Sequence, residues 1–366
     1  MAKLAETYRD DSPIEEFEVA TFVADETYAW LVCSGGTTGV LKLAAITHAS
    51  LKQKMSNMLT AMFQASESKD QPAVKEKPYI PGLNLSSIQW ISGLFQSIGM
   101  PIMQQTKIQT SATVTPEHVI DIINKYKPVT GMLGPPLVAS LWKSDKPCDY
   151  SCFRTIVVTG AKVHEDIFLA LKNRLSKNTV LMEAYGQTET LGPVLAPNPF
   201  GPVGNCGRPV PEQLLKCYYN NPEETASAFT EDGWFRTGDL LYHDENNNYF
   251  FVERLKMLIK YRNHQIIPVE LESVIRTHAG VLDVSVTSMP HAEDGEHPVA
   301  CVVRRPGADV TENEIKDLVA SKLSDVKQLR GGVIFFDKLP LTRVGKVARG
   351  ALRKLVYKMK TQEINN

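Results

Sequence analysis

The sequence predicts an α/β protein with a large N-terminal domain of parallel strands and helices, followed by a small α+β domain. The runs Thr155–Thr159 and Thr179–Met182 have the apolar, β-branched composition of central strands, and the apolar stretch Ile167–Leu175 between them predicts a helix. Strand, helix and strand in this order indicate a parallel sheet covered by helices. After about residue 252 the elements become shorter and more charged, so we expect one domain over residues 1–252 and a second over 253–366.

Three elements are expected before these strands. Tyr28–Cys33 predicts a buried strand that runs into the polar loop Ser34–Gly39. A helix is expected over Ala49–Phe63, because its Leu and Met residues recur on one face. Another helix should begin after Thr115, since Pro116 suits the first helical position.

The second domain mixes helices and strands. A helix is expected at Val269–Thr277, followed by strands at Val284–Met289 and Val299–Val303. A further helix should start at Thr311, because Glu314 stands three residues later and completes a capping box.

Composition and charge are those of an ordinary globular protein. The apolar fraction is 43%, the charged fraction 22% and the formal net charge −1, so nothing predicts a nucleic-acid partner. The six cysteines include no CxxC pair, which argues against zinc or redox chemistry at cysteines. No apolar run reaches the roughly 20 residues that span a bilayer. These features favour a protein that handles small molecules.

The loop Ser34–Gly39, extended to Lys42, is a candidate phosphate site. Glycines let backbone N–H groups approach phosphate oxygens, and Thr37, Thr38 and Lys42 add donors and positive charge. The loop is not a Walker A motif, because Gly-Lys-Ser/Thr is absent at the required spacing. Taken alone, a plain Gly/Thr-rich connection is the alternative.

A second polar cluster, Glu183–Glu189, follows a predicted central strand. Ligands bind at the carboxyl ends of strands in open parallel sheets, so this position favours a site. Tyr185 suits stacking on a flat ring, Thr188 suits a phosphate contact, and Glu189 suits Mg²⁺. A solvated turn is the alternative.

Two further motifs lie later in the chain. Gly233–Asp239 ends in a carboxylate that can accept hydrogen bonds from both hydroxyls of a ribose, with Arg254 as a possible assistant. Leu339–Lys346 places a lysine on a loop that contains glycine. For both motifs an ordinary charged surface is the alternative.

Together, and in this order, the motifs resemble the signatures of the adenylate-forming superfamily, which includes acyl-CoA synthetases, 4-coumarate-CoA ligases and beetle luciferases. The matching stretches are the phosphate loop Ser34–Lys42, the Tyr-Gly-x-Thr-Glu motif Tyr185–Glu189, the Trp-x-x-Thr-Gly-Asp motif Trp234–Asp239, the hinge segment Glu253–Glu272 and the terminal lysine motif Pro340–Lys346. The resemblance implies an AMP-binding adenylation domain over 1–252 and a mobile lid domain over 253–366.

The resemblance implies two half-reactions: ATP and Mg²⁺ convert a carboxylic acid to an acyl-adenylate, and coenzyme A then displaces AMP. It assigns catalysis to Lys346, Thr188 and Glu189, with Glu189 also holding the metal. The implied nucleotide-binding residues are Ser34, Gly36, Thr37, Thr38, Gly39, Lys42, Gly160, Ala161, Ala184, Tyr185, Gly186, Asp239 and Arg254.

The resemblance also implies that the lid moves between the two steps. Glu253 matches the hinge position, and rotation there would withdraw Lys346 and present the other face of the lid to coenzyme A. The hinge and coenzyme A face comprises Glu253, Lys256, Arg262, Asn263 and Gln265.

Trp90 matches a position beside the acyl pocket, where beetle luciferases commonly carry histidine. An apolar fatty or aryl acid and ligation to coenzyme A are therefore better expectations than light emission. An ordinary core tryptophan is the alternative for Trp90.

The chain also departs from the family pattern. Relatives carry well over a hundred residues before the phosphate loop, whereas 33 precede Ser34 here, so we expect an N-terminally incomplete domain with an exposed sheet edge or face. The stretch between Pro211 and Tyr218 is also shorter than in relatives, and Asn263 replaces a glycine beside the coenzyme A channel. Three functions therefore compete: an acyl-CoA ligase, a non-catalytic pseudo-enzyme that binds nucleotide or acyl ligand, and a luciferase-like oxygenase.

Location follows from the resemblance only in outline. Many relatives are peroxisomal, but the chain ends in Glu-Ile-Asn-Asn and not in the peroxisomal Ser-Lys-Leu. A peroxisomal and a cytoplasmic location both stay open.

Overall fold

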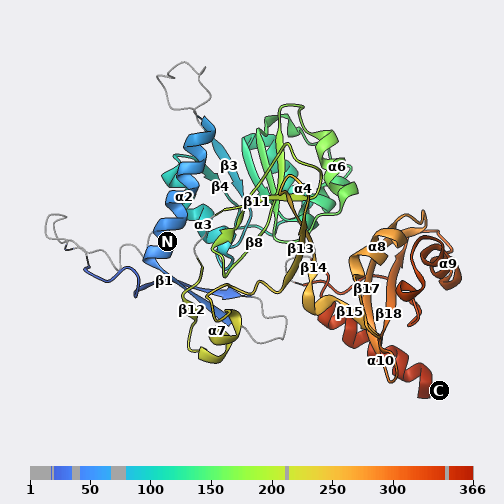
Figure 1. The fold of residues 1–366 in the computed structure, drawn as a ribbon. Coiled ribbons are helices and arrows are strands. Elements are labelled where there is room, and N and C mark those ends of the chain that lie inside the picture. Colours follow the sequence, from blue (N-terminus) through green and yellow to red (C-terminus); the bar gives the residue numbers. More distant parts are fainter. Residues whose placement is uncertain are drawn as a thin grey trace.

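The structure is a computed structural model that describes residues 18, 20–34, 42–66, 80–210, 214–342 and 346–365. Figure 1 shows a large N-terminal domain and, beside it, a smaller C-terminal domain drawn in orange and red. The predicted fold class, α/β with a parallel sheet in a large domain followed by a small domain, is confirmed.

A five-stranded parallel sheet with strand order β4-β3-β5-β6-β7 forms the centre of the large domain. Its strands are β3 (Pro81–Asn84), β4 (Thr106–Ile108), β5 (Thr130–Leu133), β6 (Thr155–Thr159) and β7 (Val180–Ala184). The helices among them are α3 (Ile91–Ile102), α4 (Pro116–Tyr126), α5 (Pro135–Lys143) and α6 (Glu165–Arg174), with a short 3₁₀ turn at Tyr150–Cys152. Because β6 and β7 run parallel, the loops that follow them lie at the same edge of the sheet.

The predicted strand at Thr155–Thr159 is confirmed with the same bounds, and the predicted helix after Thr115 is confirmed as α4. The Thr115 side chain accepts a hydrogen bond from the backbone N–H of His118 at 3.2 Å, which caps the helix. Ile156 on β6 and Ile123 on α4 are fully buried in one hydrophobic core. Removing such side chains from water supplies the main force that holds these helices on the sheet.

Three smaller sheets accompany the central one among the described residues. An antiparallel sheet contains β1 (Tyr28–Ser34), β2 (Lys42–Thr47) and β12 (Cys217–Tyr218). A four-stranded sheet contains β10 (Leu195–Ala196), β11 (Asn205–Pro209), β14 (Tyr249–Arg254) and β13 (Asp239–His243). The third pairs β8 (Gly186–Gln187) with β9 (Gly192–Pro193), and the helices of this region are α2 (His48–Ser66) and α7 (Pro222–Ala228).

The C-terminal domain, here called the lid, has its own sheet and core. Its strands are β15 (Ile259–Tyr261), β16 (His264–Ile266), β17 (Val281–His291), β18 (Gly295–Arg304) and β19 (Val333–Phe335). Its helices are α8 (Pro268–Arg276), α9 (Glu312–Lys322) and α10 (Arg349–Asn365), with a 3₁₀ turn at Asp325–Lys327. The predicted capping box at the start of α9 is confirmed, because Thr311 and Glu314 each accept a hydrogen bond from the other's backbone N–H.

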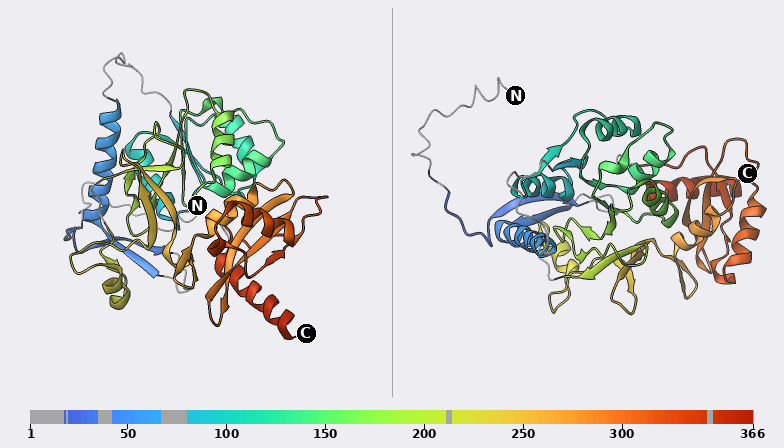
Figure 2. Two further views of the ribbon diagram at one scale, coloured as in Figure 1. Left: turned by 45° about the vertical axis from the view of Figure 1, so that its right-hand side comes forward. Right: turned by 90° about the horizontal axis from the view of Figure 1, so that it is seen from above.

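The chain passes from the large domain to the lid over residues 254–259. Strand β14 ends at Arg254, a 3₁₀ turn covers Leu255–Met257, and β15 begins the lid sheet at Ile259. Figure 2 shows the lid against one side of the large domain, with helix α10 extending away from it. No helix in the described part of the chain is long and apolar enough to cross a membrane.

Candidate active site

The candidate site begins at the carboxyl ends of β6 and β7. Gly160 follows β6, and its backbone φ of +94° lies in the left-handed region that favours glycine. Tyr185, Gly186 and Gln187 follow β7, and β8 turns the chain back toward β9. The sheet therefore places the predicted residues Gly160, Ala161, Ala184, Tyr185 and Gly186 along one edge.

Asp239, the first residue of β13, is the centre of a polar cluster. Its carboxylate accepts hydrogen bonds from the Tyr185 hydroxyl at 2.7 Å and from the Gln187 side-chain amide at 2.6 Å. Arg254 pairs with the same carboxylate, with 2.8 Å between its Nε and Oδ1. Asp239 and Arg254 face each other because β13 and β14 are antiparallel and these two residues are partners in the ladder.

Asp239 is the buried member of this cluster. The Asp239 side chain is 1% exposed, whereas that of Arg254 is 40% exposed and reaches solvent. The Arg254 guanidinium and the Gln187 amide both donate to the backbone carbonyl of Thr237. Burial, together with the negative Asp239, raises the pKa of the Tyr185 phenol well above its usual range, so Tyr185 stays a hydrogen-bond donor at neutral pH.

A second cluster surrounds Glu189, which is buried. The Ser34 hydroxyl and the Tyr218 hydroxyl both donate to the same Glu189 oxygen, the latter at 2.9 Å. Lys42 forms an ion pair with Glu224 on α7, and its ammonium lies 5.2 Å from the centre of the Tyr218 ring. The cluster thus joins the strand before the predicted phosphate loop, the strand after it and the motif that follows β7.

The lid contributes Lys346, whose ammonium donates a hydrogen bond to the backbone carbonyl of Gly160. Residues 160 and 346 are far apart in the sequence, and the contact crosses from the lid to the large domain. Packing of protein around the ammonium lowers the pKa of Lys346, and the positive Arg254 lowers it further. Lys346 therefore lies at the same edge of the sheet as the Asp239 cluster.

The cations of this region repel one another. Burial lowers the pKa of Lys256, and Arg254 and Lys42 add to the effect. Arg254 thus acts electrostatically on both Lys256 and Lys346. Asp239 opposes part of this effect at Lys256. A phosphorylated ligand here would favour the charged forms of Lys256 and Lys346, so the region suits such a ligand.

Glu253, the predicted hinge residue, lies beside Arg254 on β14 and is buried. Its Oε1 accepts a hydrogen bond from the backbone N–H of Arg254, and its Oε2 lies 3.9 Å from the guanidinium of Arg349. Arg349 is the first residue of α10 and pairs at 3.0 Å with Glu272 of α8. The linker carboxylate is thereby connected to two helices of the lid.

Other predicted residues lie outside these clusters. Arg262, Asn263 and Gln265 are exposed on the β15–β16 hairpin, where Arg262 pairs with Asp294 at 2.7 Å. Trp90 is half-buried and stands immediately before α3. The predicted phosphate-loop residues Gly36, Thr37, Thr38 and Gly39 lie outside the described residues.

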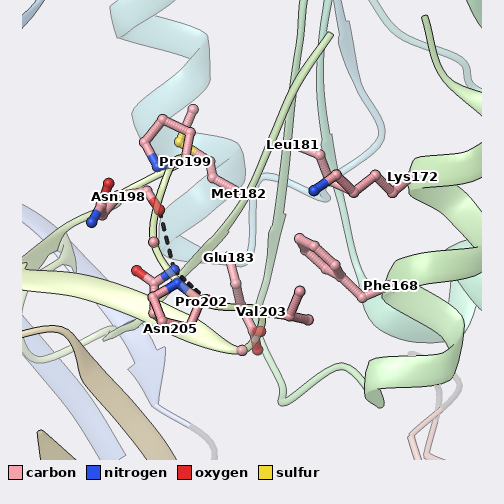
Figure 3. A pocket seen from close by; sticks show the side chains of 12 residues that line it. Phe168, Lys172, Leu181, Met182, Glu183, Asn198, Pro199, Pro202, Val203 and Asn205 are labelled. Carbon is pink, nitrogen blue, oxygen red and sulfur yellow. Dashed lines mark hydrogen bonds between the residues drawn. The ribbon is translucent and has the colours of Figure 1, made fainter. Parts of the chain in front are cut away.

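A small hollow beside β7 is separate from the predicted site. Figure 3 shows Glu183 at its edge, with Val203 and Asn205 nearby. Burial raises the pKa of Glu183 to about 7, although the backbone N–H of Val163 donates to its Oε1 at 3.2 Å. Glu183 begins the predicted polar cluster Glu183–Glu189, and none of the residues to which the family resemblance assigns a role lines the hollow.

Several residues of these clusters were not identified from the sequence. Gln187 lies inside the Tyr-Gly-x-Thr-Glu motif, and this position could have identified it as a candidate site residue. Tyr218, Glu224 and Arg349 stand in stretches with no motif, and only the folded chain brings them to Glu189, Lys42 and Glu253.

The fold and this polar edge of the sheet define a two-domain α/β protein in which cations of both domains meet at one candidate site. Comparison with protein families agrees: the model described as AMP-binding enzyme matches residues 2–225, and the model for the AMP-binding enzyme C-terminal domain matches residues 270–346. The chain therefore belongs to the AMP-binding enzyme family and so to the adenylate-forming superfamily, as its motifs predicted.

Curated relatives include two kinds of enzyme. Luciferin 4-monooxygenase of Photinus pyralis is 30% identical over 94% of this chain and 66% of its own length, and that of Photuris pensylvanica is 29% identical over 95% and 68%. The 4-coumarate–CoA ligase 3 of Oryza sativa subsp. japonica is 30% identical over 94% and 67%. The chain thus spans about two thirds of the length of these relatives.

Solved structures confirm the fold. ATP-bound MatB from Rhodopseudomonas palustris aligns with a TM-score of 0.79 at 24% identity, over 94% of this chain and 71% of its own. MenE from Bacillus subtilis in complex with AMP gives 0.73 at 21% identity, over 89% and 69%. The apo structure of the same MatB, over the same shares of both chains, gives only 0.63. By this measure, the structure of this chain is more similar to ATP-bound MatB than to apo MatB.

Proposed function

We propose that this protein activates a carboxylic acid with ATP, forming an acyl-adenylate, and then transfers the acyl group to coenzyme A. The observation that carries the proposal is the contact of Lys346 with the Gly160 carbonyl, at the edge of the sheet that also holds the Asp239 cluster. A lysine reaching from one domain into the polar edge of another has little structural purpose, because the contact is a single hydrogen bond to an exposed turn.

The first half-reaction joins two anions. A carboxylate oxygen of the acid attacks the α-phosphorus of ATP, the bond to the bridging oxygen breaks, and pyrophosphate leaves with the electron pair. Lys346 is well suited to this step, because an ammonium beside both reactants stabilises the charge that gathers on the α-phosphate in the transition state. Its lowered pKa reflects neighbouring protein and Arg254, and a bound phosphate would favour the charged form.

Nucleotide recognition follows from the two polar clusters. Asp239 and Arg254 suit the ribose, since a buried carboxylate held by Tyr185 and Gln187 is oriented before any ligand arrives. The proposed adenine slot is lined by Gly160, Ala161, Ala184, Tyr185 and Gly186. Ser34, Lys42 and the phosphate loop between them are proposed to hold the β- and γ-phosphates.

The residues present also fit Mg²⁺. Glu189 offers a carboxylate, a hard oxygen ligand of the kind Mg²⁺ prefers, beside the proposed phosphate loop. The ion would supply positive charge to the triphosphate. Thr188, the neighbour of Glu189, is proposed to contact phosphate.

The second half-reaction requires a different face of the lid. The coenzyme A thiol attacks the acyl carbon, AMP leaves and the thiol proton is lost. We propose that the large domain ends at residue 252 and that the lid, 253–366, turns about Glu253, removing Lys346 and presenting Lys256, Arg262, Asn263 and Gln265. The buried Glu253 links through Arg349 to the lid helices, which suits a residue that transmits such a rotation.

The proposed acid is a fatty or aryl acid. Trp90, half-buried before α3, offers an apolar surface for such a substrate. The relatives named 4-coumarate–CoA ligase support an aryl acid and coenzyme A.

Acid-dependent exchange of labelled pyrophosphate into ATP tests the first step. The acids are short, medium and long fatty acids and cinnamates. Lys346→Ala should lower the exchange rate by about 10²–10³-fold, which is the usual effect of removing one group that stabilises transition-state charge. Lys338→Ala, at an exposed position of the same lid segment, is the matched control and should leave exchange unchanged.

Formation of the acyl-CoA, measured as the loss of free thiol, tests the second step separately. Exchange without thioester would restrict the function to adenylation, and light with luciferin and O₂ would favour the monooxygenase chemistry named for the luciferase relatives. A folded chain that shows no pyrophosphate exchange with any of these acids would contradict the proposal and favour a non-catalytic binder.

A further inference from the structure

Three potential metal ligands gather at the tip of the β17–β18 hairpin of the lid (Figure 1), outside the site described above. His291 is the last residue of β17, Asp294 lies in the turn, and His297 is the third residue of β18. One ligand atom of each residue lies within 4.8 Å of the others. The hairpin register, which pairs His291 with Gly295, folds these residues onto one another.

The distances are close to those of a metal site. His297 Nε2 lies 2.7 Å from Asp294 Oδ2, and His291 Nδ1 lies 3.6 Å from the same oxygen. Ligand bonds of about 2.0–2.1 Å to a tetrahedral ion place the ligand atoms about 3.3 Å apart. The two observed distances bracket that value, and a metal ion would replace the hydrogen bond between His297 and Asp294.

The two imidazole rings are stacked face to face, so one ring must tilt before the in-plane lone pairs of both can meet at one ion. Their centres are 4.0 Å apart and their planes differ by 19°, so the rings stack beside the carboxylate. The backbone N–H of Asp294 donates a long hydrogen bond, 3.3 Å, to His291 Nδ1, and a metal ion on this nitrogen would replace that bond. The His291 side chain is 39% exposed and those of Asp294 and His297 are 13% exposed, which leaves an approach from solvent.

We propose that His291, Asp294 and His297 bind one divalent transition-metal ion, with Zn²⁺ as the best fit and water as the fourth ligand. Two imidazoles and one carboxylate suit a borderline ion such as Zn²⁺, Co²⁺ or Ni²⁺, whereas Mg²⁺ prefers oxygen ligands. The site is independent of the proposed adenylation chemistry.

Arg262 gives the site its supporting contact. Its guanidinium pairs at 2.7 Å with Oδ1 of Asp294, while Oδ2 faces the two histidines. The backbone N–H of Arg262 also donates to the Asp294 carbonyl at 2.7 Å. A metal on Asp294 would therefore fix the β15–β16 turn as well as the hairpin, and such supporting contacts orient ligands at metal sites. The positive Arg262 opposes a second positive charge, which limits affinity but leaves Oδ2 available.

The test uses the full chain, stripped of metal with a chelator, and titrates it with Co²⁺. A bound tetrahedral Co²⁺ ion gives visible d–d absorption, and displacement by Zn²⁺ reports the Zn²⁺ affinity. We expect one equivalent to bind. His291→Asn and His297→Asn should each weaken binding at least about tenfold, and the double variant should abolish it. His243→Asn, an exposed histidine in the large domain, is the control for adventitious imidazole binding and should change nothing.

Circular dichroism and gel filtration establish that each variant is folded. Asp294→Asn keeps the size of the side chain and provides a second test if a histidine variant is unstable. Binding that persists in the double variant, thiolate charge-transfer bands from cysteine ligation, or a preference for Mg²⁺ over Zn²⁺ would each overturn the proposal.

Discussion

The Asp239 cluster and the lid lysine meet at the same edge of the sheet, but they are held in opposite ways. Asp239 is 1% exposed and has three partners: Tyr185 and Gln187 of the large domain, and Arg254, the last residue of β14. Lys346 reaches the same region from another domain through one hydrogen bond to the Gly160 carbonyl. A group with several buried partners is fixed, whereas a group with one partner can leave at low cost. The contrast matches the proposed function, in which the site holds the nucleotide throughout and the lid turns between the two steps.

Among the variants that test this contrast, Arg349→Met in the lid should have the largest effect on stability. Glu272 is almost fully buried, and burial already raises its pKa. Removing Arg349 leaves this buried carboxyl without its ion-pair partner, since the nearby Arg276 pairs with Asp283. The free energy of unfolding should therefore fall by about 3 kcal/mol. Urea unfolding followed by circular dichroism measures the loss.

The matched control is Arg353→Met, which removes an exposed arginine of the same helix that pairs with Glu296. Its effect should stay below about 1 kcal/mol, because exposed ion pairs contribute little. Equal losses from the two variants would show that the Arg349 link to Glu253 and Glu272 has no special role in the lid.

Glu183 provides a test in the large domain, through the pH dependence of stability. Its pKa in the folded protein is about 7, above the ordinary 4.5, because of burial. Between these values the folded state binds more protons than the unfolded state, so stability should fall as pH rises from about 4.5 through 7 and then level off. The loss should be about 3 kcal/mol.

Glu183→Gln should flatten that part of the stability profile, and Glu223→Gln, at an exposed position, should not. Thermal unfolding across pH 4–9 provides the measurement. A profile that is identical in wild type and Glu183→Gln would contradict a buried proton at this position.

Asp239→Asn tests whether the fixed cluster binds nucleotide. Hydrogen bonds to a charged group are worth about 1.5–3 kcal/mol, so ATP affinity should fall about 10–100-fold. Isothermal titration calorimetry measures it directly. Asp232→Asn, in the exposed turn before Gly233, is the control. If Lys346→Ala weakens ATP binding as much as Asp239→Asn does, the distinction between a fixed binding cluster and a lid that acts on the rate is wrong.

The smallest effect is expected at the start of α9. Thr311→Ala removes the N-cap hydrogen bond to the backbone N–H of Glu314 and should lower stability by about 1 kcal/mol. Asn313→Ala, in the exposed first turn, should be neutral or slightly stabilising, since alanine favours helix. Hydrogen exchange of the α9 amides locates the effect; faster exchange only in the large domain would contradict it.

The local sequence pattern was enough to predict several helices and strands. The strand Thr155–Thr159, the capped helix after Thr115 and the capping box at Thr311 depend on neighbouring residues, and each is found where it was predicted. The helix predicted over Ile167–Leu175 is found as Glu165–Arg174, and helix ends are set by capping contacts that periodicity does not report. The strand order β4-β3-β5-β6-β7 was not read from the sequence, because it depends on how the crossovers return the chain.

For the candidate site, the sequence by itself determined the chemical groups: Asp239, Arg254, Glu189 and Lys346 stand in motifs whose order predicted the superfamily. Only the tertiary structure decided their partners. Gln187 and Arg254 meet at Asp239, Tyr218 meets Glu189, and Lys346 meets Gly160 across 186 positions of sequence. Such contacts depend on sheet register and domain placement, which are set by the burial of whole surfaces and not by the residues on either side of a motif.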